Sequence, residues 1–288
     1  MDIAAEAQHF GIVTMLETKQ LSVQLGSQAI LENITFTAQP GQFCAIIGPN
    51  GSGKTTLMRA LSGDIAFTGE ARLHGLNIAN ANAWEMAMLR AVLPQASNLS
   101  FPFTVREIVR LGLTTGVAEE TNPSDPIQIS DQALNHVDLE GFGSRFYQEL
   151  SGGEQQRVQM ARVLCQVWQP VLQGKSRYLF LDEPISSLDI KHQIQIMGIA
   201  RAYAARGGAV LAILHDLNLT AMFADAVVLL DHGRVFAQGR PSDVLTTENL
   251  SQVYQYPLAV NTTPKKPSIF VLPHAATTQL PGVSEDRV

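Results

Sequence analysis

The sequence predicts an α/β fold, and three apolar segments that each end in polar residues carry this prediction. The first, Phe43 to Ile47, runs into the glycine-rich stretch Gly48–Thr55, after which apolar residues recur at helical spacing. The second runs from Tyr178 to the acids Asp182 and Glu183, and the third is Ala209 to Leu214, followed by His215. Strand-length runs between helical patterns indicate parallel strands, whose carboxyl ends meet at one edge of a sheet. The polar residues are therefore expected to lie together.

Composition indicates a globular protein that acts inside the cell. The chain has 288 residues with 45% apolar content, enough for one large domain or two modest ones. Its net charge of −6 argues against nucleic acid as a main partner. Cys44 and Cys165 sit in apolar segments and are read as buried thiols in a reducing compartment. The acidic stretch Met1–Phe10 lacks a signal-peptide core, and no apolar run reaches membrane-spanning length, so any membrane role requires a partner.

A small antiparallel β layer is predicted beside this sheet. Four short segments rich in β-branched residues are separated by polar or glycine positions, as is typical of antiparallel strands. They are Ile12–Glu17, Leu21–Leu25, Ile34–Thr37 and Glu70–Leu73.

The stretch after the first apolar strand has the pattern of a phosphate-binding loop, G-x-x-x-x-G-K-[ST]. It consists of Gly48, Pro49, Asn50, Gly51, Ser52, Gly53, Lys54 and Thr55. The glycines let successive backbone N–H groups face one anion, and Lys54 can reach the β and γ phosphates. The Thr55 hydroxyl is the expected Mg²⁺ ligand, with Thr56 as the less favoured neighbour. A plain glycine-rich turn is the alternative, which the flanking strand and helix disfavour.

Gln95 follows a predicted helix, Trp84–Leu89, and a short strand, Ala91–Leu93. An amide at a strand exit can coordinate Mg²⁺ or orient water. Taken alone, the position is more typical of an ordinary loop residue.

From Ser97 to Trp168 the pattern changes to helices and loops, which indicates an inserted helical unit. Thr104 and Glu107 have capping-box spacing before an apolar-periodic helix. Thr114–Ser130 is predicted to be a surface loop, and a second helix is predicted near Asp131–Val137.

A second capping box, Ser151 to Glu154, opens a helix that continues to Trp168. Gly152 and Gly153 then lie in a helix N-terminal turn with free N–H groups, which would make a second anion site. The alternative, glycines that merely allow close packing, stays open on local spacing alone.

Asp182 and Glu183 end a buried strand, where adjacent acids are costly unless they bind something. Beside a phosphate loop, Asp182 is expected to hold Mg²⁺ and Glu183 to position or deprotonate a water, rather than both being solvated turn acids. Asp189 caps the predicted helix Ile190–Arg206. His215 can reach a γ-phosphate, although a single strand-end histidine is usually structural.

Taken together and in this order, these motifs resemble the ATP-binding cassette (ABC) ATPase family over residues 12–256. The resemblance implies a P-loop NTPase (RecA-like) core, residues 1–94 and 169–256, with an antiparallel β subdomain. It implies a helical signalling subdomain, 95–168, and a partly disordered tail, 257–288. Gln95 becomes the Q-loop glutamine, Ser151 to Gln155 the signature, Asp182 and Glu183 the Walker B pair, Asp189 the D-loop acid and His215 the switch histidine.

The family further implies ATP and Mg²⁺ as cofactors and a head-to-tail homodimer that encloses the nucleotide. Partners would be two membrane permease subunits and, indirectly, a periplasmic haem-binding protein, with the chain peripheral on the cytoplasmic face of the bacterial inner membrane. Strings such as Val92–Ser97 and Phe101–Val105 are similar to importers for metal chelates, nearest to those for haem. Ferric siderophore and cobalamin importers are alternatives.

Two more distant classes are disfavoured. Soluble ABC ATPases that act on nucleic acid or ribosomes carry a coiled-coil insertion or a second cassette, and this sequence has neither. A metabolic P-loop kinase leaves the signature turn unexplained.

One position departs from the ABC pattern. The family usually places an aromatic residue that stacks on adenine just before the glycine that corresponds to Gly26, and here Leu25 stands there. Weak discrimination between ATP and GTP is therefore predicted.

Overall fold

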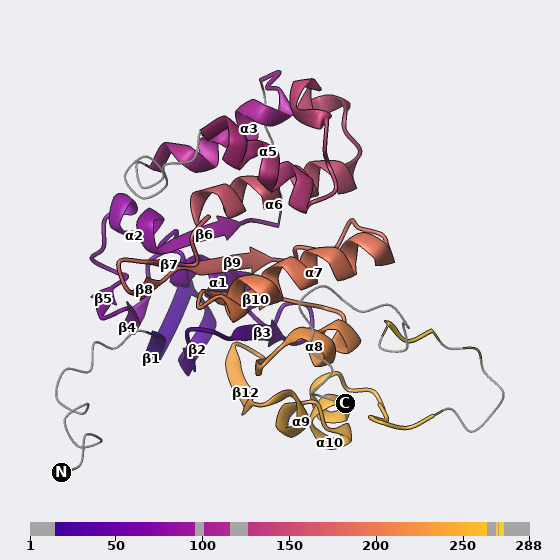
Figure 1. Cartoon of the computed structure of the whole chain (residues 1–288). Helices are drawn as coiled ribbons and strands as arrows, with labels where there is room; N and C mark the ends of the chain where they lie inside the picture. Colours follow the sequence, from indigo (N-terminus) through magenta and orange to yellow (C-terminus); the bar gives the residue numbers. More distant parts are fainter. Residues whose placement is uncertain (1–14, 96–100, 116–125, 264–268, 270, 274–288) are drawn as a thin grey trace, which may run out of the picture.

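The computed structural model describes residues 15–95, 101–115, 126–263, 269 and 271–273. It confirms the predicted α/β class, with two sheets and a separate group of helices (Figure 1). The larger sheet has the strand order β12-β11-β3-β10-β9-β6. Its strands are β3 (Phe43–Ile47), β6 (Arg90–Leu93), β9 (Tyr178–Asp182), β10 (Ala209–Ile213), β11 (Ala226–Asp231) and β12 (Arg234–Gly239).

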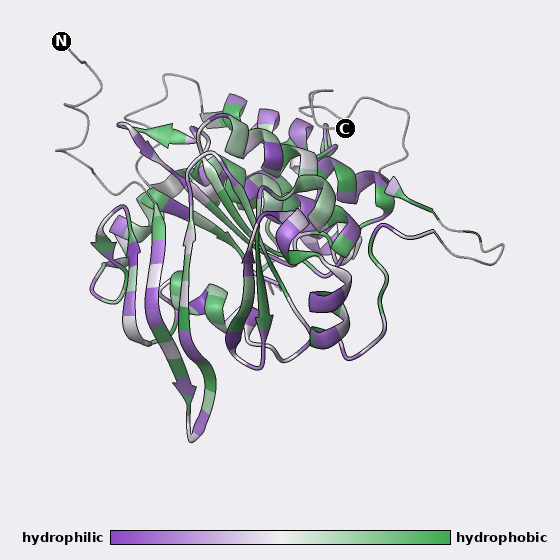
Figure 2. Cartoon of the chain, turned by 90° about the horizontal axis from the view of Figure 1, so that it is seen from below, coloured by the Kyte–Doolittle hydropathy of each residue, from purple (hydrophilic) through white to green (hydrophobic). Residues whose placement is uncertain are grey.

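Five strands of this sheet are parallel, and β12 at one edge is antiparallel to β11. Strands β3, β9 and β10 are buried along their whole length because both faces of the sheet are covered. In β3, Phe43, Ala45 and Ile47 join one apolar core, while Cys44 and Ile46 join the other. The hydropathy colouring of Figure 2 shows these apolar strands in the interior.

The carboxyl ends of the three central strands lie at one level. Ile213 of β10 pairs with Ile46 of β3 and with Asp182 of β9. The segments that follow these strands therefore leave the sheet side by side, as the sequence predicted.

The predicted antiparallel layer is a four-stranded sheet with the order β2-β1-β4-β5. Its strands are β1 (Leu16–Leu25), β2 (Gln28–Ala38), β4 (Thr68–Leu73) and β5 (Leu76–Asn77). Two separate strands were expected over Ile12–Glu17 and Leu21–Leu25, but the described residues form the single strand β1. Gln20 takes a positive φ of 52°, and the pairing register shifts beyond Lys19 while the strand continues. Residues 12–14 lie outside the described part.

Helix α1 (Lys54–Leu61) lies between the two sheets. Its buried face, which includes Leu57 and Leu61, belongs to the same apolar core as strand residues of both sheets. The phosphate-loop pattern is thus held between the two layers.

The helical group lies beyond the β6 edge of the larger sheet (Figure 1). It contains α3 (Val105–Leu111), η1 (Gly112–Thr115), α5 (Pro126–His136), η2 (Phe142–Ser144), η3 (Tyr147–Glu149) and α6 (Gly152–Gln166). Both predicted capping boxes, Thr104 with Glu107 and Ser151 with Glu154, are present.

The predicted surface loop over Thr114–Ser130 was wrong at both of its described ends. The chain is still in η1 at Thr115, and α5 begins at Pro126. Proline is tolerated in the first turn of a helix, where its missing N–H would have no partner. Burial of Ile129, Ala133 and Val137 then favours the helix.

The remaining elements complete the core. The predicted helix near Trp84 and the predicted long helix after Asp189 are confirmed, whereas the small hairpin β7-β8 was not predicted. These elements are α2 (Ala83–Leu89), β7 (Val171–Leu172), β8 (Lys175–Ser176), α7 (Ile190–Ala205), α8 (Leu217–Phe223), α9 (Pro241–Val244) and α10 (Thr247–Val253). None of the helices in the described residues has the length and apolarity of a membrane span. The stretch 275–288, expected to be disordered, lies outside the described residues.

Candidate nucleotide site

The phosphate-binding loop leaves β3 and turns directly into α1. Gly48, Gly51 and Gly53 take positive φ values of 146°, 80° and 98°, which side chains disfavour. A Cβ on Gly48 would lie 2.2 Å from the Leu230 carbonyl oxygen, and one on Gly53 would lie 2.5 Å from the Leu31 side chain. The loop conformation therefore requires these glycines.

Lys54 is buried inside this loop. Its Nζ donates to the carbonyl oxygens of Gly48 at 2.9 Å and Pro49 at 2.8 Å. Burial lowers the pKa of Lys54, while the charges of Glu183 and Asp182 act in the opposite direction. The buried Ser52 hydroxyl has no hydrogen-bond partner among the described residues. A phosphate group would supply oxygen acceptors to both side chains.

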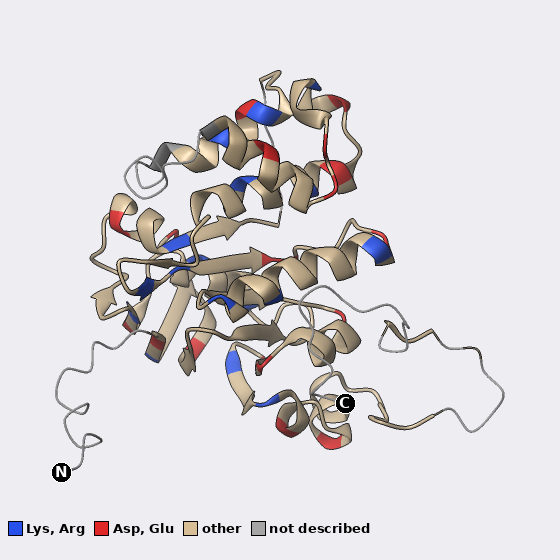
Figure 3. Cartoon of the chain, viewed as in Figure 1, with Lys and Arg blue, Asp and Glu red and all other residues tan. Residues whose placement is uncertain are grey.

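Asp182 ends β9 opposite the start of α1. The Thr55 hydroxyl donates to Asp182 Oδ1 at 3.4 Å, and Thr56 follows half-buried on α1. Asp182 is only 5% exposed, and burial, followed by the Glu183 charge, raises the pKa of this carboxyl to about 6. A carboxylate and a hydroxyl that face each other are oxygen ligands that suit Mg²⁺, and its charge would offset this burial. Figure 3 shows the acidic end of β9.

Glu183 and His215 form a pair across neighbouring strand ends. Glu183 Oε1 lies 2.7 Å from His215 Nε2, and Glu183 itself has a positive φ of 52°. The His215 side chain is 43% exposed, whereas that of Glu183 is 16% exposed. The imidazole is therefore accessible to a ligand while it contacts the carboxylate.

Gln95 lies two residues beyond β6 and is exposed. Because Leu93 pairs with Leu181, the chain leaves β6 at about the same level at which it leaves β9. The structure thus brings Gln95 to the sheet edge that carries Asp182 and Glu183.

The second predicted anion site, the Ser151–Glu154 turn, caps α6. The Ser151 backbone N and hydroxyl both donate to Glu154 Oε2 at 2.8 Å, and the Glu154 backbone N donates to Ser151 Oγ at 3.3 Å. A Cβ on Gly153 would lie 3.1 Å from the Ser187 carbonyl oxygen, whereas Gly152 is exposed with open space around it. Gly153 therefore allows close packing, and Gly152 leaves the turn open, so that anion binding by this turn stays a prediction.

Asp189 caps α7, as predicted. Its carboxylate accepts from the His192 backbone N at 2.9 Å and lies 2.8 Å from His192 Nδ1. The hydrogen bond from the His192 backbone is the main cause of a lowered pKa at Asp189.

A cavity of about 300 Å³ adjoins the phosphate-binding loop. The described residues that line it are Pro49, Asn50, Gly51, Ser52, Asp231, His232, Val253, Tyr254 and Gln255. None of them belongs to the Ser151–Glu154 turn, so the two predicted anion sites do not share this cavity within one chain.

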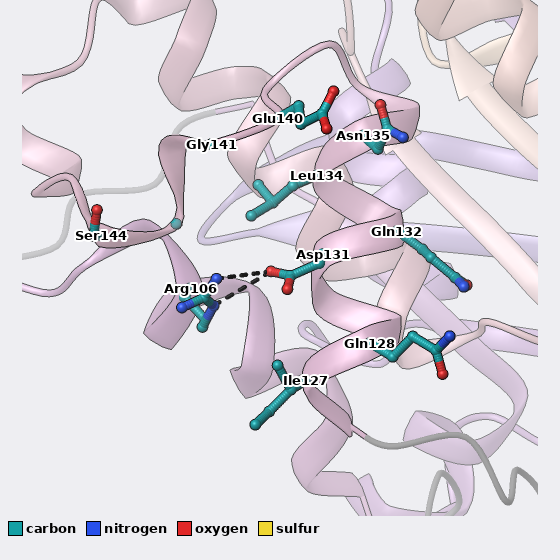
Figure 4. Close-up of a pocket in the computed structure, with 11 residues that line it drawn as sticks. Arg106, Ile127, Gln128, Asp131, Gln132, Leu134, Asn135, Glu140, Gly141 and Ser144 are labelled. Carbon is teal, nitrogen blue, oxygen red and sulfur yellow. Dashed lines mark hydrogen bonds and ion pairs between the residues drawn. The ribbon is translucent and has the colours of Figure 1, made fainter.

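A larger cavity of about 750 Å³ lies in the helical group, where Arg106 of α3 reaches across to Asp131 of α5 (Figure 4). None of the predicted site residues is among the described residues lining it. Because it lacks these residues, this cavity is not the candidate nucleotide site, although it is the larger of the two.

Two neighbours of the site were missed by sequence reasoning. Tyr254, the residue that follows α10, lines the cavity beside the loop, and burial raises the pKa of its phenol while the Gly48 backbone acts in the opposite direction. Gln156 of α6 bonds to the turn that follows β9. Neither residue carries a sequence signal for its place at the site, since one is a single tyrosine outside the motifs and the other is one of two successive glutamines.

The fold and this constellation define a P-loop protein built to bind a nucleoside triphosphate. A family model described as ABC transporter matches residues 31–186, which include the loop, the capped turn and the paired acids. The chain therefore belongs to the ABC transporter family.

Individual members of this family are similar to the chain over nearly its whole length. The chain is 55% identical to a protein named "Hemin import ATP-binding protein HmuV" from Mesorhizobium japonicum, over 91% of this chain and 99% of that protein. A protein of the same name from Jannaschia sp. is also 55% identical, over 91% of this chain and 95% of its own length. Among solved structures, an ATP-binding subunit of an ABC transporter matches with a TM-score of 0.69 and 25% identity, over 85% of this chain and 95% of that one.

Proposed function

We propose that this chain is the ATPase subunit of an ABC importer that takes up haem through membrane permease subunits. The observation that carries the proposal is that a phosphate-binding loop whose Thr55 contacts Asp182, next to the Glu183–His215 pair, occurs in a chain 55% identical to hemin import ATP-binding proteins over nearly their whole length. The haem itself would pass through the permease, so this chain supplies the energy and not the haem pocket.

The phosphate-binding loop, Gly48–Thr56, would hold the ATP phosphates. Backbone N–H groups of the glycine turns and the α1 N-terminus face the anion, and Lys54 exchanges its carbonyl contacts for phosphate oxygens. Thr55, Asp182 and Gln95 would hold Mg²⁺. When bound, Mg²⁺ neutralises phosphate charge.

Glu183 is proposed as the general base that accepts a proton from the attacking water. Its carboxylate is held by His215 at 2.7 Å, so the two side chains act as a unit. The exposed part of the imidazole would face the γ-phosphate. Lys54 and His215 then stabilise charge on the transferred group, while Glu183 receives the proton.

The homodimer follows from the separation of the two anion sites. Ser151, Gly152, Gly153 and Glu154 form an open capped turn, yet none of these residues lines the cavity beside the phosphate-binding loop. A head-to-tail dimer would place this turn on the nucleotide held by the other copy. Hydrolysis would then remove the phosphate that both copies contact and let the interface open.

The remaining assignments rest on this function. The chain would work at the cytoplasmic face of the bacterial inner membrane, bound to two permease subunits, with a periplasmic haem-binding protein as an indirect partner. We divide it into a nucleotide-binding core (1–94 and 169–256), a helical signalling subdomain (95–168) and a tail (257–288).

The catalytic assignment predicts different behaviour for substitutions at Glu183 and at Lys54. Glu183→Gln should bind ATP normally, hydrolyse it at least about 100-fold more slowly and accumulate as an ATP-bound dimer, because only the base is lost. Lys54→Ala should lose binding and hydrolysis together, because the lysine contacts both ground and transition states. ATPase assays, nucleotide binding and gel filtration measure these effects. Normal turnover by Glu183→Gln would remove Glu183 from the reaction.

The substrate is tested in cells. A strain that lacks this chain should fail to grow on haem as sole iron source and should recover when the chain, but not Glu183→Gln, is restored. Growth on ferric siderophores and cobalamin uptake should be unaffected. Loss of siderophore or cobalamin uptake with haem growth intact would assign the importer to those chelates instead.

A pull-down from membranes tests the partner. The restored chain should recover a hydrophobic permease, and recovery of RNA in its place would contradict the transport assignment.

A further inference from the structure

The turn between β9 and α7, Glu183–Leu188, is held by side-chain amides from two helices in addition to its own backbone hydrogen bonds. These run from Ser186 N to the Glu183 carbonyl oxygen at 3.4 Å and from Leu188 N to that of Ile185 at 3.2 Å. From α6, Gln156 Nε2 donates to the Glu183 carbonyl oxygen at 2.9 Å, and the Ser187 backbone N donates to Gln156 Oε1 at 3.3 Å. One amide therefore binds both ends of the turn, through its donor and its acceptor.

The other side of the turn is held from α7. Gln193 Nε2 donates to the carbonyl oxygens of Ile185 at 3.3 Å and Leu188 at 3.0 Å. Ile185 and Leu188 are 6% and 9% exposed, so the turn is also packed into the core. The Glu183 carbonyl receives, in addition, the Ser186 hydroxyl at 3.3 Å.

The Gln156 contact acts at a strained point of the backbone. Glu183 has a φ of 52°, a left-handed conformation that is unfavourable for a non-glycine residue. An amide that captures the Glu183 carbonyl offsets this cost and sets the direction of the side chain that meets His215. Misplacing such a group by about 1 Å can slow a reaction by roughly 100-fold.

We propose that Gln156 is a positioning residue that links the Ser151–Glu154 turn to the catalytic turn of the same chain. Gln156 follows the Ser151–Glu154 turn by two residues on α6, and Gly153 packs against Ser187. The amide therefore makes the capped turn and the Glu183 backbone move together. This inference rests on the proposed function. There, the capped turn contacts the nucleotide held by the other copy, and Glu183 acts on the nucleotide held by its own chain.

Three substitutions separate the two halves of the contact. Gln156→Met removes both hydrogen bonds at similar volume, Gln156→Glu keeps only the acceptor for Ser187, and Gln156→Lys keeps only the donor to Glu183. We expect kcat to fall about tenfold or more in the Met and Glu variants and less than about threefold in the Lys variant, with KM for ATP within about twofold throughout.

Gln195→Met is the matched control. Gln195 Nε2 also bonds α7 to the helical group, at the His136 carbonyl oxygen with 3.0 Å, but it does not touch the catalytic turn. Its kcat should stay within about twofold of the unmodified chain, and the unfolding temperature of each variant reports separately the structural cost of the lost hydrogen bonds.

The outcomes are distinct. Unchanged kcat in Gln156→Met, a Lys variant as slow as the Glu variant, or an equal loss in Gln195→Met would each overturn the proposal. If Gln156→Met fails to fold, the Lys and Glu pair decides alone. Full hydrolysis by Glu183→Gln would instead overturn the catalytic assignment on which the inference rests.

Discussion

At the scale of single residues, Asp182 is a carboxyl group whose surroundings disfavour the charged form that a Mg²⁺ ligand needs. Burial and the Glu183 charge raise its pKa to about 6, while the Thr55 hydroxyl, Lys54 and His215 act the other way. A buried carboxylate whose charge is disfavoured has a strong reason to bind a cation. The sequence could predict the buried acid, because a carboxylate seldom ends a strand of five buried residues, and its binding of a cation stays a prediction.

A pH dependence of stability follows for the chain without nucleotide and Mg²⁺. The pKa of Asp182 is higher in the folded than in the unfolded state, so folding binds a proton and stability falls as pH rises from about 4 through 6. Asp182→Asn should lack this fall and unfold at least about 2 °C higher at pH 8. Thermal unfolding in EDTA between pH 4 and 8 measures this difference. If the unfolding temperatures of the two proteins change in parallel with pH, the raised pKa of Asp182 is not the cause.

Leu25 carries a second prediction at this scale. Its side chain is 47% exposed at the end of β1, and an aliphatic residue cannot stack on a base as an aromatic ring does. Affinities for ATP and GTP should differ by less than about threefold, and Leu25→Tyr should favour ATP by about 1 kcal/mol. Titration of both nucleotides measures this. A strong ATP preference of the unmodified chain would mean that another group recognises adenine.

At the scale of elements, sequence patterns predicted what is fixed locally and missed what distant contacts fix. The capping boxes at Thr104 and Ser151 are closed by residues three positions away, so their spacing predicts them. The start of α5 at Pro126 depends on burial of the later helix residues Ile129 and Ala133, and the bulge at Gln20 depends on pairing with β2 and β4. A single segment encodes neither. The hairpin β7-β8 turns at Gln173 and Gly174, both with positive φ, and only the glycine signals it.

The join between β3 and α1 yields a prediction at the same scale. In Gly48→Ala the new Cβ would meet the Leu230 carbonyl oxygen of β11 at 2.2 Å, so the loop must move off the sheet. Gly51→Ala is the control for a change at a positive φ, since its φ is 80° but no atom lies within 4 Å of the new Cβ. ATP affinity should fall more than about tenfold further in Gly48→Ala than in Gly51→Ala, since overpacking adds about 1–3 kcal/mol. Equal losses would assign the effect to backbone strain alone.

At the scale of the whole molecule, the sequence predicted which residues meet at the sheet edge, because strand order and parallel pairing bring Asp182, Glu183 and His215 together. It did not predict the ties between the helical group and the core. Gln156 acts on the Glu183 carbonyl oxygen, 27 residues further along the chain, and a backbone acceptor leaves no pattern in the side chains. Such contacts become visible only with the assembled fold.

The proposed dimer makes the last prediction, through the two anion sites that one chain keeps apart. A Glu183→Gln chain that also carries Asn50→Cys and Ser151→Cys should cross-link into a covalent dimer with a short bis-maleimide only when ATP and Mg²⁺ are present. Both replaced residues are exposed, whereas Cys44 and Cys165 are buried thiols whose pKa burial raises to about 12, so they remain unreactive. Chains with either cysteine alone serve as controls. If the double-cysteine chain binds ATP yet gives no dimer band, or if either single-cysteine chain gives the same band, Ser151 does not meet the phosphate-binding loop of another copy, and the shared nucleotide site is wrong.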